Sequence, residues 1–329
     1  MKKILQYLFE HKTLSREKAK EVLLDIAAAQ YNETEIASFI TVYLMRSVSI
    51  EELQGFKDAL LELSAPFTTT DTLIDIVGTG GDGKNTFNIS TLSSFIVAGT
   101  GNKVAKHGNY SASSISGSSN VMEQLGYGFT NNQELLQKQL DEANICFLHA
   151  PLFHPALKSV SGTRKNLAVR TFFNMLGPLV NPAKPAYQLI GVYNLEIARI
   201  YTYLLQQEAT AFTIIHGLDG YDEISLTGDT KVFKNDGEKI LSAEAIGKRT
   251  VLPSDIYGGA SVEEAAALFL KIIRGEGSWA QNAVVIANAA MALNCMPKYA
   301  DYETCYQLAV DSLESGKALH ALKKLIPAL

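Results

Sequence analysis

The sequence predicts an α/β protein in which a small all-helical N-terminal domain precedes a large domain with a mainly parallel central sheet covered by helices. Three observations support this fold class. Residues 1–64 show helical spacing of apolar residues and no strand pattern. From residue 73 onward, short β-branched apolar runs alternate with helical patterns, which is typical of a parallel sheet with helices on both faces. Residues 262–329 are helical again, with alanine-rich faces suited to tight packing.

Composition narrows the class of protein further. The chain has 329 residues, 47% hydrophobic and 19% charged, which is typical of a soluble enzyme with a substantial core. The net charge is −5 and Lys or Arg never occur more than two in a row, so we expect no nucleic-acid partner. No apolar stretch reaches the ~18 residues of a membrane span, and Glu10 and His11 interrupt a signal-peptide pattern. The scattered Cys146, Cys295 and Cys305 form no metal-binding spacing and fit a reducing cytoplasm, where we expect the protein.

Two helix starts are recognisable in the N-terminal domain. Asn32 with Glu35, and Ser49 with Glu52, each form a capping-box pair, in which side chains and backbone N–H groups bond reciprocally. So small a bundle is not expected to bury all its apolar faces alone, so it should pack either on a partner or on the rest of its own chain. The apolar stripe between the two starts has three- and four-residue spacing and consists of Ile36, Phe39, Ile40, Tyr43 and Leu44.

The domain boundary is expected next to a threonine-rich segment. Pro66–Asp71, with three consecutive threonines, has the composition of a linker or turn. We therefore assign residues 1–64 to the helical domain. We also expect helices from about residues 155–180 to join this domain in space. Residues 65–329 are assigned to the α/β domain, which carries the candidate site.

The strands of the α/β domain determine where a ligand should bind. Helices separate the expected strands, which lie near residues 73–77, 103–107, 145–149, 187–192 and 211–216. A later stretch, Ile224–Phe233, has strand character without an intervening helix, so the sheet can be mixed at one edge. In such sheets ligands bind beyond the carboxyl ends of the strands.

The loop after the first strand is unusually rich in glycine. Gly78, Gly80, Gly81 and Gly83 fall within six residues, so the backbone there can bend sharply and lie close to a ligand. A helical pattern, Asn88–Ala98, follows directly.

A second loop repeats this outline. After the strand pattern Lys103–Lys106 come Gly108, Gly117 and six serines, and the next helix is expected to begin near Ser118. A strand, a Gly/Ser loop and a helix start together present free N–H groups and a positive helix end to an anion. One such loop would more often be a solvated turn, but two after neighbouring strands favour a single large phosphorylated ligand.

Two common phosphate-binding patterns fit only in part. Gly78–Gly83 matches G-x-G-x-x-G, but Val104–His107 occupies the place where an acid is expected about 20 residues later. Gly78–Lys84 nearly matches a P-loop, but Asn85 stands where a Ser or Thr should bind Mg²⁺. Asp82 would repel a phosphate, so we expect it to cap the loop's own N–H groups or to hold a ligand hydroxyl.

An adjacent pair of acids, Asp222 and Glu223, follows the last expected parallel strand. Mg²⁺ prefers one or two carboxylates together with water and phosphate oxygens, so such a pair can bind it without further protein ligands. Adjacent side chains diverge in extended backbone, so the two acids could serve different ions. The alternative is a solvated surface turn, since most charged residues are exposed.

Several short blocks occur in a fixed order along the chain. Four blocks lie in and next to the two loops: Gly78–Asp82, Thr86–Thr91, Lys106–Asn109 and Ser116–Ser118. Three more blocks follow later in the chain: Ala150-Pro151 with His154–Ala156, Asn174–Pro182 and Asp222–Ser225. Together they closely resemble the signature of the anthranilate phosphoribosyltransferase family, over nearly the whole chain. The resemblance implies an enzyme of tryptophan biosynthesis, which transfers the phosphoribosyl group of phosphoribosyl diphosphate (PRPP) to the amine of anthranilate. It also implies a homodimer formed through the helical domain.

The resemblance implies the residues of the site as well. The metal site would consist of Ser90, Asp222 and Glu223 and hold Mg²⁺, as two ions per active site. Lys106 would stabilise the departing diphosphate with its compact charge. Anthranilate would contact Gly78, Asn109, Arg164, His107 and Pro178, with Arg164 paired to its carboxylate. PRPP would be bound by Gly78, Gly81, Asp82, Thr86, Asn88, Ile89, Ser90, Thr91, Lys106, His107, Gly108, Asn109, Ser113, Ser114 and Ser118.

Taken singly, some of these residues have plainer interpretations. Arg164 could form a surface ion pair, and His107 could be a packing residue. We find no Ser/His/Asp or Cys/His arrangement, and an aniline-type nitrogen needs no strong base, so no acid–base residue is assigned. His149 and His154 are not assigned a catalytic role.

The chain departs from the family pattern at two places. Tyr110 stands where the second loop commonly has Arg, which removes a cation near the phosphates. Gly162-Thr163-Arg164 and Asn166-Leu167-Ala168 replace the usual Pro-Val-Arg and Glu-Leu-Gly. We expect these changes to affect affinity or acceptor shape rather than the class of reaction.

Two other functions stay open at this point. A nucleoside phosphorylase-like enzyme would use a similar cleft, but it would bind inorganic phosphate and would not need Asp222 and Glu223 with Mg²⁺. A non-catalytic, nucleic-acid-binding relative of the same fold would retain DNA in a salt-dependent way, against which the acidic composition argues.

Overall fold

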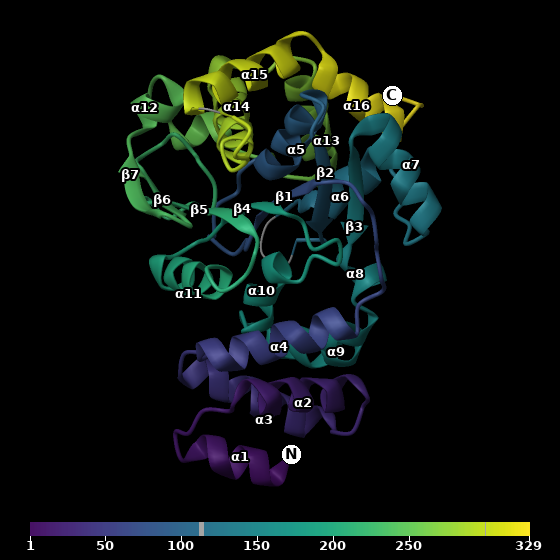
Figure 1. The fold of residues 1–329 in the computed structure, drawn as a ribbon, viewed down its shortest axis with the longest axis vertical. Helices are drawn as coiled ribbons and strands as arrows, with labels where there is room; N and C mark the ends of the chain where they lie inside the picture. The colour runs from purple at the N-terminus through teal and green to yellow at the C-terminus, as the bar shows by residue number, and fades with distance from the viewer. Residues whose placement is uncertain (112–114, 300) are drawn as a thin grey trace. The chain divides into compact units, whose positions relative to one another are not determined.

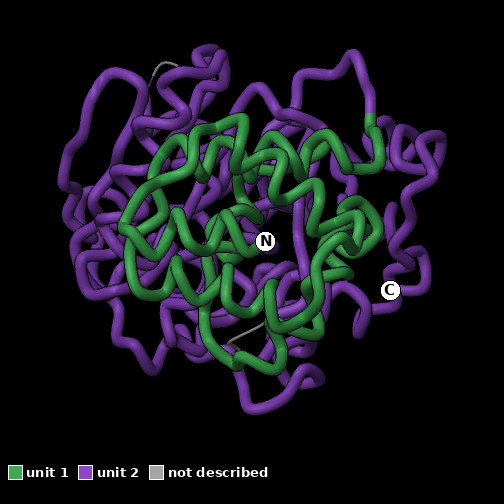
Figure 2. The backbone as a smooth tube through the Cα atoms, turned by 90° about the horizontal axis from the view of Figure 1, so that it is seen from below, with its two compact units in different colours: residues 1–67, 150–182 green, residues 68–149, 183–329 purple. Residues whose placement is uncertain are grey.

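The computed structural model describes residues 1–111, 115–299 and 301–329. The chain divides into two compact units, each built from two segments (Figure 2). The helical unit consists of Met1–Phe67 and Ala150–Pro182, and the sheet unit consists of Thr68–His149 and Ala183–Leu329.

The helical unit begins with four helices, whose starts follow from local sequence. Both expected capping boxes are present, at Asn32 with Glu35 and at Ser49 with Glu52, which confirms the two predicted helix starts. Its helices are α1 (Lys2–Phe9), α2 (Arg16–Ala27), α3 (Glu33–Met45), α4 (Ile50–Glu62), α8 (Ala150–Phe153), α9 (Lys158–Leu167) and α10 (Phe173–Leu176), with 3-10 turns at Pro155–Leu157 and Gly177–Leu179.

An aromatic cluster forms the core of the helical unit. Phe56 on α4 stacks on Phe172, with ring centroids 4.6 Å apart, and Phe39 on α3 lies edge-on to both. Gly55 lets α4 approach α2, since a Cβ there would lie 2.2 Å from the carbonyl oxygen of Arg16. Residues before position 67 and residues after position 150 thus share one core.

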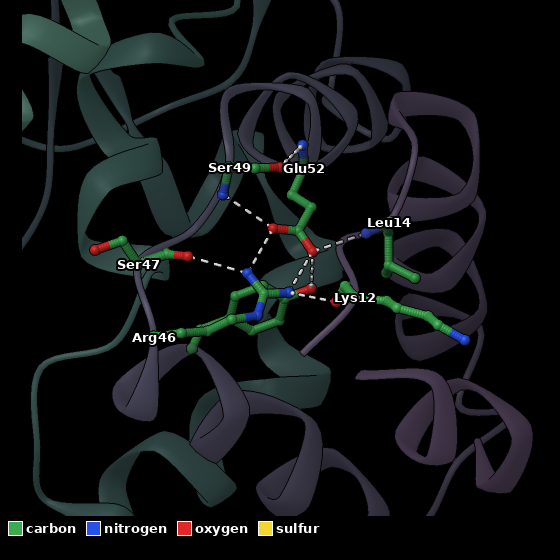
Figure 3. A network of polar contacts seen from close by, with 7 residues as sticks. Lys12, Leu14, Arg46, Ser47, Ser49 and Glu52 are labelled. Carbon is green, nitrogen blue, oxygen red and sulfur yellow. Dashed lines mark hydrogen bonds and ion pairs between the residues drawn. The ribbon is translucent and has the colours of Figure 1, made fainter. Parts of the chain in front are cut away.

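A buried carboxylate ties the N-terminal helices together (Figure 3). Glu52 is fully buried, and its two oxygens accept bonds from the Arg46 guanidinium at 2.6 and 2.9 Å. The same oxygens accept from the N–H groups of Leu14 and Ser49 and from the hydroxyl of Tyr43. Burial alone would raise the pKa of Glu52, but the bonds from Arg46 and the two N–H groups outweigh it and lower the pKa.

The sheet unit contains one seven-stranded sheet in the order β3-β2-β1-β4-β5-β6-β7. The first five strands pair in parallel and the last two antiparallel, which confirms a mainly parallel sheet that is mixed at one edge. The strands are β1 (Leu73–Gly78), β2 (Lys103–Gly108), β3 (Ile145–His149), β4 (Tyr187–Gly191), β5 (Ala211–Gly217), β6 (Thr230–Lys234) and β7 (Gly237–Leu241).

The expected strand Ile224–Phe233 was wrong in its first half, because β6 begins only at Thr230. Both backbone polar groups of Ile224 bond to the side chain of Asn288, so they are not available to a neighbouring strand. Leu226 has a φ of 60°, a left-handed conformation that interrupts extended backbone.

Helices flank the sheet as the alternating pattern predicts, and Figure 1 shows α11 on the opposite side of the sheet from α5 and α14. The helix α14 packs against α5, α15 and β4, and most of its residues are buried. None of the helices within the described ranges is long and apolar enough to cross a membrane. The helices are α5 (Ile89–Gly99), α6 (Ser118–Gln124), α7 (Gln133–Ala143), α11 (Leu195–Leu205), α12 (Ala243–Gly247), α13 (Val262–Ile273), α14 (Trp279–Leu293), α15 (Tyr302–Glu314) and α16 (Lys317–Leu325), with a 3-10 turn at Pro253–Ile256.

Candidate active site

The two predicted loops and the acid pair all follow parallel strands of the sheet unit, so they leave the sheet at the same edge. Strands β1, β2 and β5 end at Gly78, Gly108 and Gly217. Strand order reverses between β1 and β4, where Gly78 lies in register with Gly191. Open α/β sheets bind ligands at such a reversal, beyond the carboxyl ends of the strands. The candidate site therefore lies beyond β1 and its neighbours.

The first loop needs its glycines for conformation. Gly80, Gly81 and Gly83 have φ values of 64°, 78° and 74°, which other residues adopt only with strain. Asp82 accepts a hydrogen bond from Lys84 N at 2.9 Å. This confirms that Asp82 caps an N–H group of its own loop, one of the two roles expected for it.

A segment that the sequence analysis missed pairs with the end of this loop. Thr86 forms an antiparallel bridge with Tyr257, and the Asn85 side chain donates to the carbonyl oxygen of Gly259 at 2.8 Å. Gly258 permits the approach, because a Cβ there would lie 2.4 Å from the Thr86 carbonyl oxygen. No local motif marks this segment; only its glycine pair hints at a close backbone contact.

Asp222 is buried and linked to the first loop. Its Oδ2 accepts a hydrogen bond from Gly80 N at 2.7 Å, which bridges 142 positions of sequence. This close approach of Asp222 requires glycine as the last residue of both β1 and β4. A Cβ at Gly78 would lie 2.6 Å from Asp222 Oδ2, and one at Gly191 would lie 1.6 Å from the Asp222 carbonyl oxygen. A solvated surface turn is therefore excluded for the acid pair.

The second acid reaches the start of α5. Glu223 Oε1 accepts from Ser90 N at 3.3 Å, in the first turn of that helix, where the helix dipole favours negative charge. Burial, with a contribution from the nearby Asp82 carboxylate, raises the pKa of Asp222 to about 7. Burial and the charge of Asp222 raise the pKa of Glu223 as well. A cation beside the pair would stabilise both carboxylates in their charged form.

The acid pair fits a cation that needs few protein ligands. Among the described residues, no group of three or more His, Cys, Asp or Glu side chains could hold a metal ion. A buried and a partly buried carboxylate with a hydroxyl nearby are instead the donor set that suits Mg²⁺ when a substrate supplies phosphate oxygens. Ser90, whose backbone N–H bonds to Glu223, carries a hydroxyl in the same turn, and its contact with a metal stays a prediction.

Lys106 is a buried residue whose side chain bonds to β1 and to the start of α5. It is 2% exposed, and its Nζ donates to the Ile76 carbonyl oxygen at 2.6 Å and to Ser90 Oγ at 3.4 Å. Burial lowers the pKa of Lys106, although the charges of Asp75 and Glu223 oppose the shift. Contact between its ammonium and a diphosphate stays a prediction.

Asp75 is a second residue that the sequence analysis missed. It is fully buried in β1, and its Oδ1 accepts from His107 N at 3.2 Å on the neighbouring strand. A charged residue inside the apolar run Leu73–Val77 was the signal, because such a residue is rarely buried without a partner.

The second loop is held by side-chain amides. Asn120 Oδ1 accepts from Ser111 N at 2.9 Å and from Gly117 N at 3.0 Å. Asn88, at the start of α5, donates from Nδ2 to the Ser116 carbonyl oxygen at 3.0 Å and so connects the two loops. Ser118 Oγ donates to the Asn109 carbonyl oxygen at 3.4 Å.

Two predicted contact residues have a side-chain atom without a hydrogen-bond partner within the part of the chain that the structure describes. These atoms are Thr91 Oγ1, whose side chain is buried, and Asn88 Oδ1. Buried polar atoms normally find a partner, so these two mark positions where a ligand could supply one. The predicted contacts Ser113 and Ser114 lie outside the described residues.

Tyr110, which replaces the family's usual Arg, has a structural partner. Its hydroxyl donates to Glu123 at 3.3 Å, and its ring lies edge-on to His149 at 5.0 Å. His149 is buried, stacks on Phe129 with centroids 4.3 Å apart and bonds to Ser119 Oγ at 2.9 Å. These contacts give His149 a packing role.

The remaining predicted residues belong to the helical unit. Arg164 lies on α9 with its guanidinium 5.2 Å from the centre of the Phe173 ring, and burial lowers its pKa. Pro178 is buried in the turn Gly177–Leu179. His154 is buried and its Nε2 bonds to the Val180 carbonyl oxygen at 2.8 Å, so it too is a packing residue.

Comparison with known proteins bears on both parts of the chain. Residues 2–64 match the helical bundle domain of a glycosyl transferase family, and residues 70–319 match its α/β domain. The chain is 55% identical over 326 residues to the anthranilate phosphoribosyltransferase of Christiangramia forsetii, covering 99% of this chain and 98% of that one. It is 54% identical over 327 residues to that of Bacteroides fragilis strain YCH46, covering 99% of each.

Two solved structures have the same fold. Anthranilate phosphoribosyltransferase from Thermus thermophilus superposes with a TM-score of 0.91 at 31% identity, and the match covers 98% of each chain. The enzyme from Saccharomyces cerevisiae, solved in complex with PRPP and Mg, superposes with a TM-score of 0.87 at 27% identity. That match covers 96% of this chain and 93% of the yeast chain.

Proposed function

The chain belongs to the anthranilate phosphoribosyltransferase family, and from that membership we propose that it transfers the phosphoribosyl group of PRPP to the amine of anthranilate. The products are N-(5-phosphoribosyl)anthranilate and diphosphate, so the enzyme is a pentosyltransferase of tryptophan biosynthesis. One observation in this chain supports the proposal most directly. Asp222 accepts a hydrogen bond from Gly80 N in the first loop, and Glu223 accepts one from Ser90 N in the first turn of α5.

The two loops would hold the charged ends of PRPP. Asn88 joins them through its bond to Ser116, which keeps both within reach of one ligand. The unpartnered Thr91 Oγ1 is a ready hydrogen-bonding group for a phosphate oxygen, and backbone N–H groups of the glycine loop supplement it. Lys106 adds a positive charge beneath the loop.

Mg²⁺ would be held by Asp222, Glu223 and Ser90, with the remaining ligands from water and PRPP. Both carboxylates have raised pKa values, which fits a site completed by a cation. When bound, the metal supplies charge neutralisation for the departing diphosphate. We propose two ions per site, because adjacent acid side chains diverge and here bond to different elements.

The reaction breaks the bond between the anomeric carbon and the diphosphate oxygen and forms a bond from that carbon to the anthranilate nitrogen. Positive charge develops on the sugar, as in glycoside cleavage. The electron pair of the broken bond stays on diphosphate, whose charge Lys106 and the loop N–H groups stabilise. The proton lost by nitrogen passes to solvent, since the uncharged amine attacks without a strong base. Holding the amine in line with the leaving group supplies a further large factor.

Anthranilate recognition is assigned to residues at the ends of β1 and β2 and to residues of the helical unit. We propose that Asn109 bonds the amine or carboxylate beside Gly78 and His107, and that Arg164 pairs with the carboxylate in two-pronged fashion. Arg164 is suited to this because its guanidinium is packed on Phe173 and partly buried, which strengthens a charge pair. Pro178 would also contact anthranilate.

We also propose that the protein is a cytoplasmic homodimer formed through the helical unit. Phe9 at the end of α1 and Met45 at the end of α3 are 62% and 85% exposed, and they offer apolar surface of the helical unit to a second copy. Replacing both with serine should convert the dimer to a monomer in light scattering. A wild-type monomer would overturn this part of the proposal.

The decisive experiment measures diphosphate release from PRPP with four acceptors: anthranilate, nicotinate, adenine and uracil. We expect turnover with anthranilate alone, and only when Mg²⁺ is present. Release with a nucleobase, or phosphate-dependent cleavage of a nucleoside without Mg²⁺, would favour a phosphorylase-like enzyme. Retention on DNA without turnover would favour a binding protein.

A further inference from the structure

Asn288 lies on α14, 64 positions along the chain from Ile224 beside the acid pair, and none of the roles above involves it. Its side chain is 1% exposed. Nδ2 donates to the Ile224 carbonyl oxygen at 2.8 Å, and Oδ1 accepts from Ile224 N at 3.1 Å. The second hydrogen of Nδ2 goes to the Val284 carbonyl oxygen at 2.9 Å within the helix. The amide thus binds both backbone groups of one residue, as a neighbouring strand would.

The segment that contains the acid pair is therefore fixed at three successive residues. Asp222 bonds to Gly80 N, Glu223 bonds to Ser90 N, and Ile224 bonds to Asn288. The first two bonds use the carboxylate oxygens, which a cation would also use. The bonds to Asn288 use only the backbone, so they persist whatever the carboxylates bind.

We infer that Asn288 is a positioning residue for the metal-binding acids: it holds the backbone after Glu223 so that both carboxylates stay directed at the two loops. The inference rests on the proposed function and extends it to a residue outside the loops. Groups that orient metal ligands typically change metal affinity by about 10-fold or more when removed. Loss of the Asn288 bonds should therefore weaken cation binding about 10-fold.

The alternative is a purely structural amide that satisfies two buried backbone groups. Removing it would then lower the melting temperature without changing the affinity of a folded protein for the cation. Two variants separate these roles. Asn288→Leu keeps the same number of side-chain heavy atoms and removes all the bonds. Asn288→Asp keeps the acceptor for Ile224 N and loses the donors to the Ile224 and Val284 carbonyl oxygens.

The matched control is Ser93→Ala. Ser93 is fully buried on α5, and its Oγ donates to the Val285 carbonyl oxygen at 3.2 Å on the same helix α14. Its removal costs a buried hydrogen bond of the same kind without touching residues 222–224. A change seen in Asn288→Leu but absent from Ser93→Ala is therefore specific to the acid pair.

The probe is Mn²⁺ with PRPP, in the absence of anthranilate, with free Mn²⁺ measured by electron paramagnetic resonance. We expect PRPP-dependent Mn²⁺ binding in the wild type and in Ser93→Ala, a loss of about 10-fold in Asn288→Leu, and an intermediate loss in Asn288→Asp. Mn²⁺ affinity within about two-fold of wild type in both variants would overturn the inference, since ~10-fold is expected. If Asn288→Leu does not fold, Asn288→Asp decides, because it differs from the wild type by a single group.

Failure of the proposed function would look different. A wild-type protein without PRPP-dependent Mn²⁺ binding and without diphosphate release would refute the proposed reaction itself. Wild-type binding that the Asn288 variants retain would refute only the positioning role.

Discussion

The substitution Gly191→Ala tests how closely the candidate site depends on backbone contact. A Cβ at this position would lie 1.6 Å from the Asp222 carbonyl oxygen, and side-chain Cβ atoms do not come closer than about 3.0 Å to a neighbour. Either β4 or the Asp222 backbone must therefore move by about 1.4 Å, the difference between these two distances. β4 pairs on both sides with parallel strands, so we expect the Asp222 segment to move instead.

The size of the effect follows from that displacement. A misplacement of about 1 Å at a site of this kind can cost about 100-fold in turnover. We expect kcat for diphosphate release to fall at least about 100-fold. We also expect a higher Mg²⁺ requirement, because Asp222 is displaced from its hydrogen bond with Gly80 N. The matched control is Gly128→Ala, whose Cβ would meet nothing within 4 Å and whose activity should be unchanged. Turnover of Gly191→Ala within about three-fold of wild type would refute the reasoning, since ~100-fold is expected.

Three further predictions address other parts of the molecule. Asp222→Asn with Glu223→Gln should abolish turnover at ordinary Mg²⁺ and leave the circular dichroism spectrum unchanged; normal rates would remove the metal role. Arg164→Ala should chiefly raise the KM for anthranilate, whereas a change confined to the KM for PRPP would contradict its assignment to the acceptor. Glu52→Gln breaks a buried ion pair and should lower the free energy of unfolding of the helical unit by about 3–5 kcal/mol, measured by hydrogen exchange of residues 1–64. The pKa of Glu52 is lowered in the folded state, so its contribution to stability is fully present above the unfolded pKa of about 4.3. That contribution is lost as pH falls from there through the lower folded pKa, and the variant should lack this acid sensitivity.

Much of the fold could be predicted because its signals are local. Capping boxes at Asn32 and Ser49 lie within four residues of their partners, and strand periodicity needs only a short window. The paired Gly/Ser loops indicated the candidate site for the same reason. Asp82 was also predictable, since the N–H group that it caps belongs to Lys84.

What could not be predicted depends on partners far apart in sequence. Ile224–Phe233 has the composition of a strand, but Asn288 occupies the backbone of Ile224 from 64 residues away. The role of Asn288 cannot be recognised in an alanine-rich helix, because one buried amide leaves no periodic pattern. The glycines at positions 78 and 191 have no conformational reason of their own and are explained only by the approach of Asp222.

The division of the helical unit into two stretches of chain has a consequence for how the protein is made. Phe172, which stacks on Phe56, leaves the ribosome more than a hundred residues after it. Until then the nascent N-terminal helices have no complete core, and their aromatic face is open to chaperones or to aggregation. An excised fragment of residues 1–64 should accordingly fail to form a stable bundle, even though α2, α3 and α4 each begin at a capping side chain.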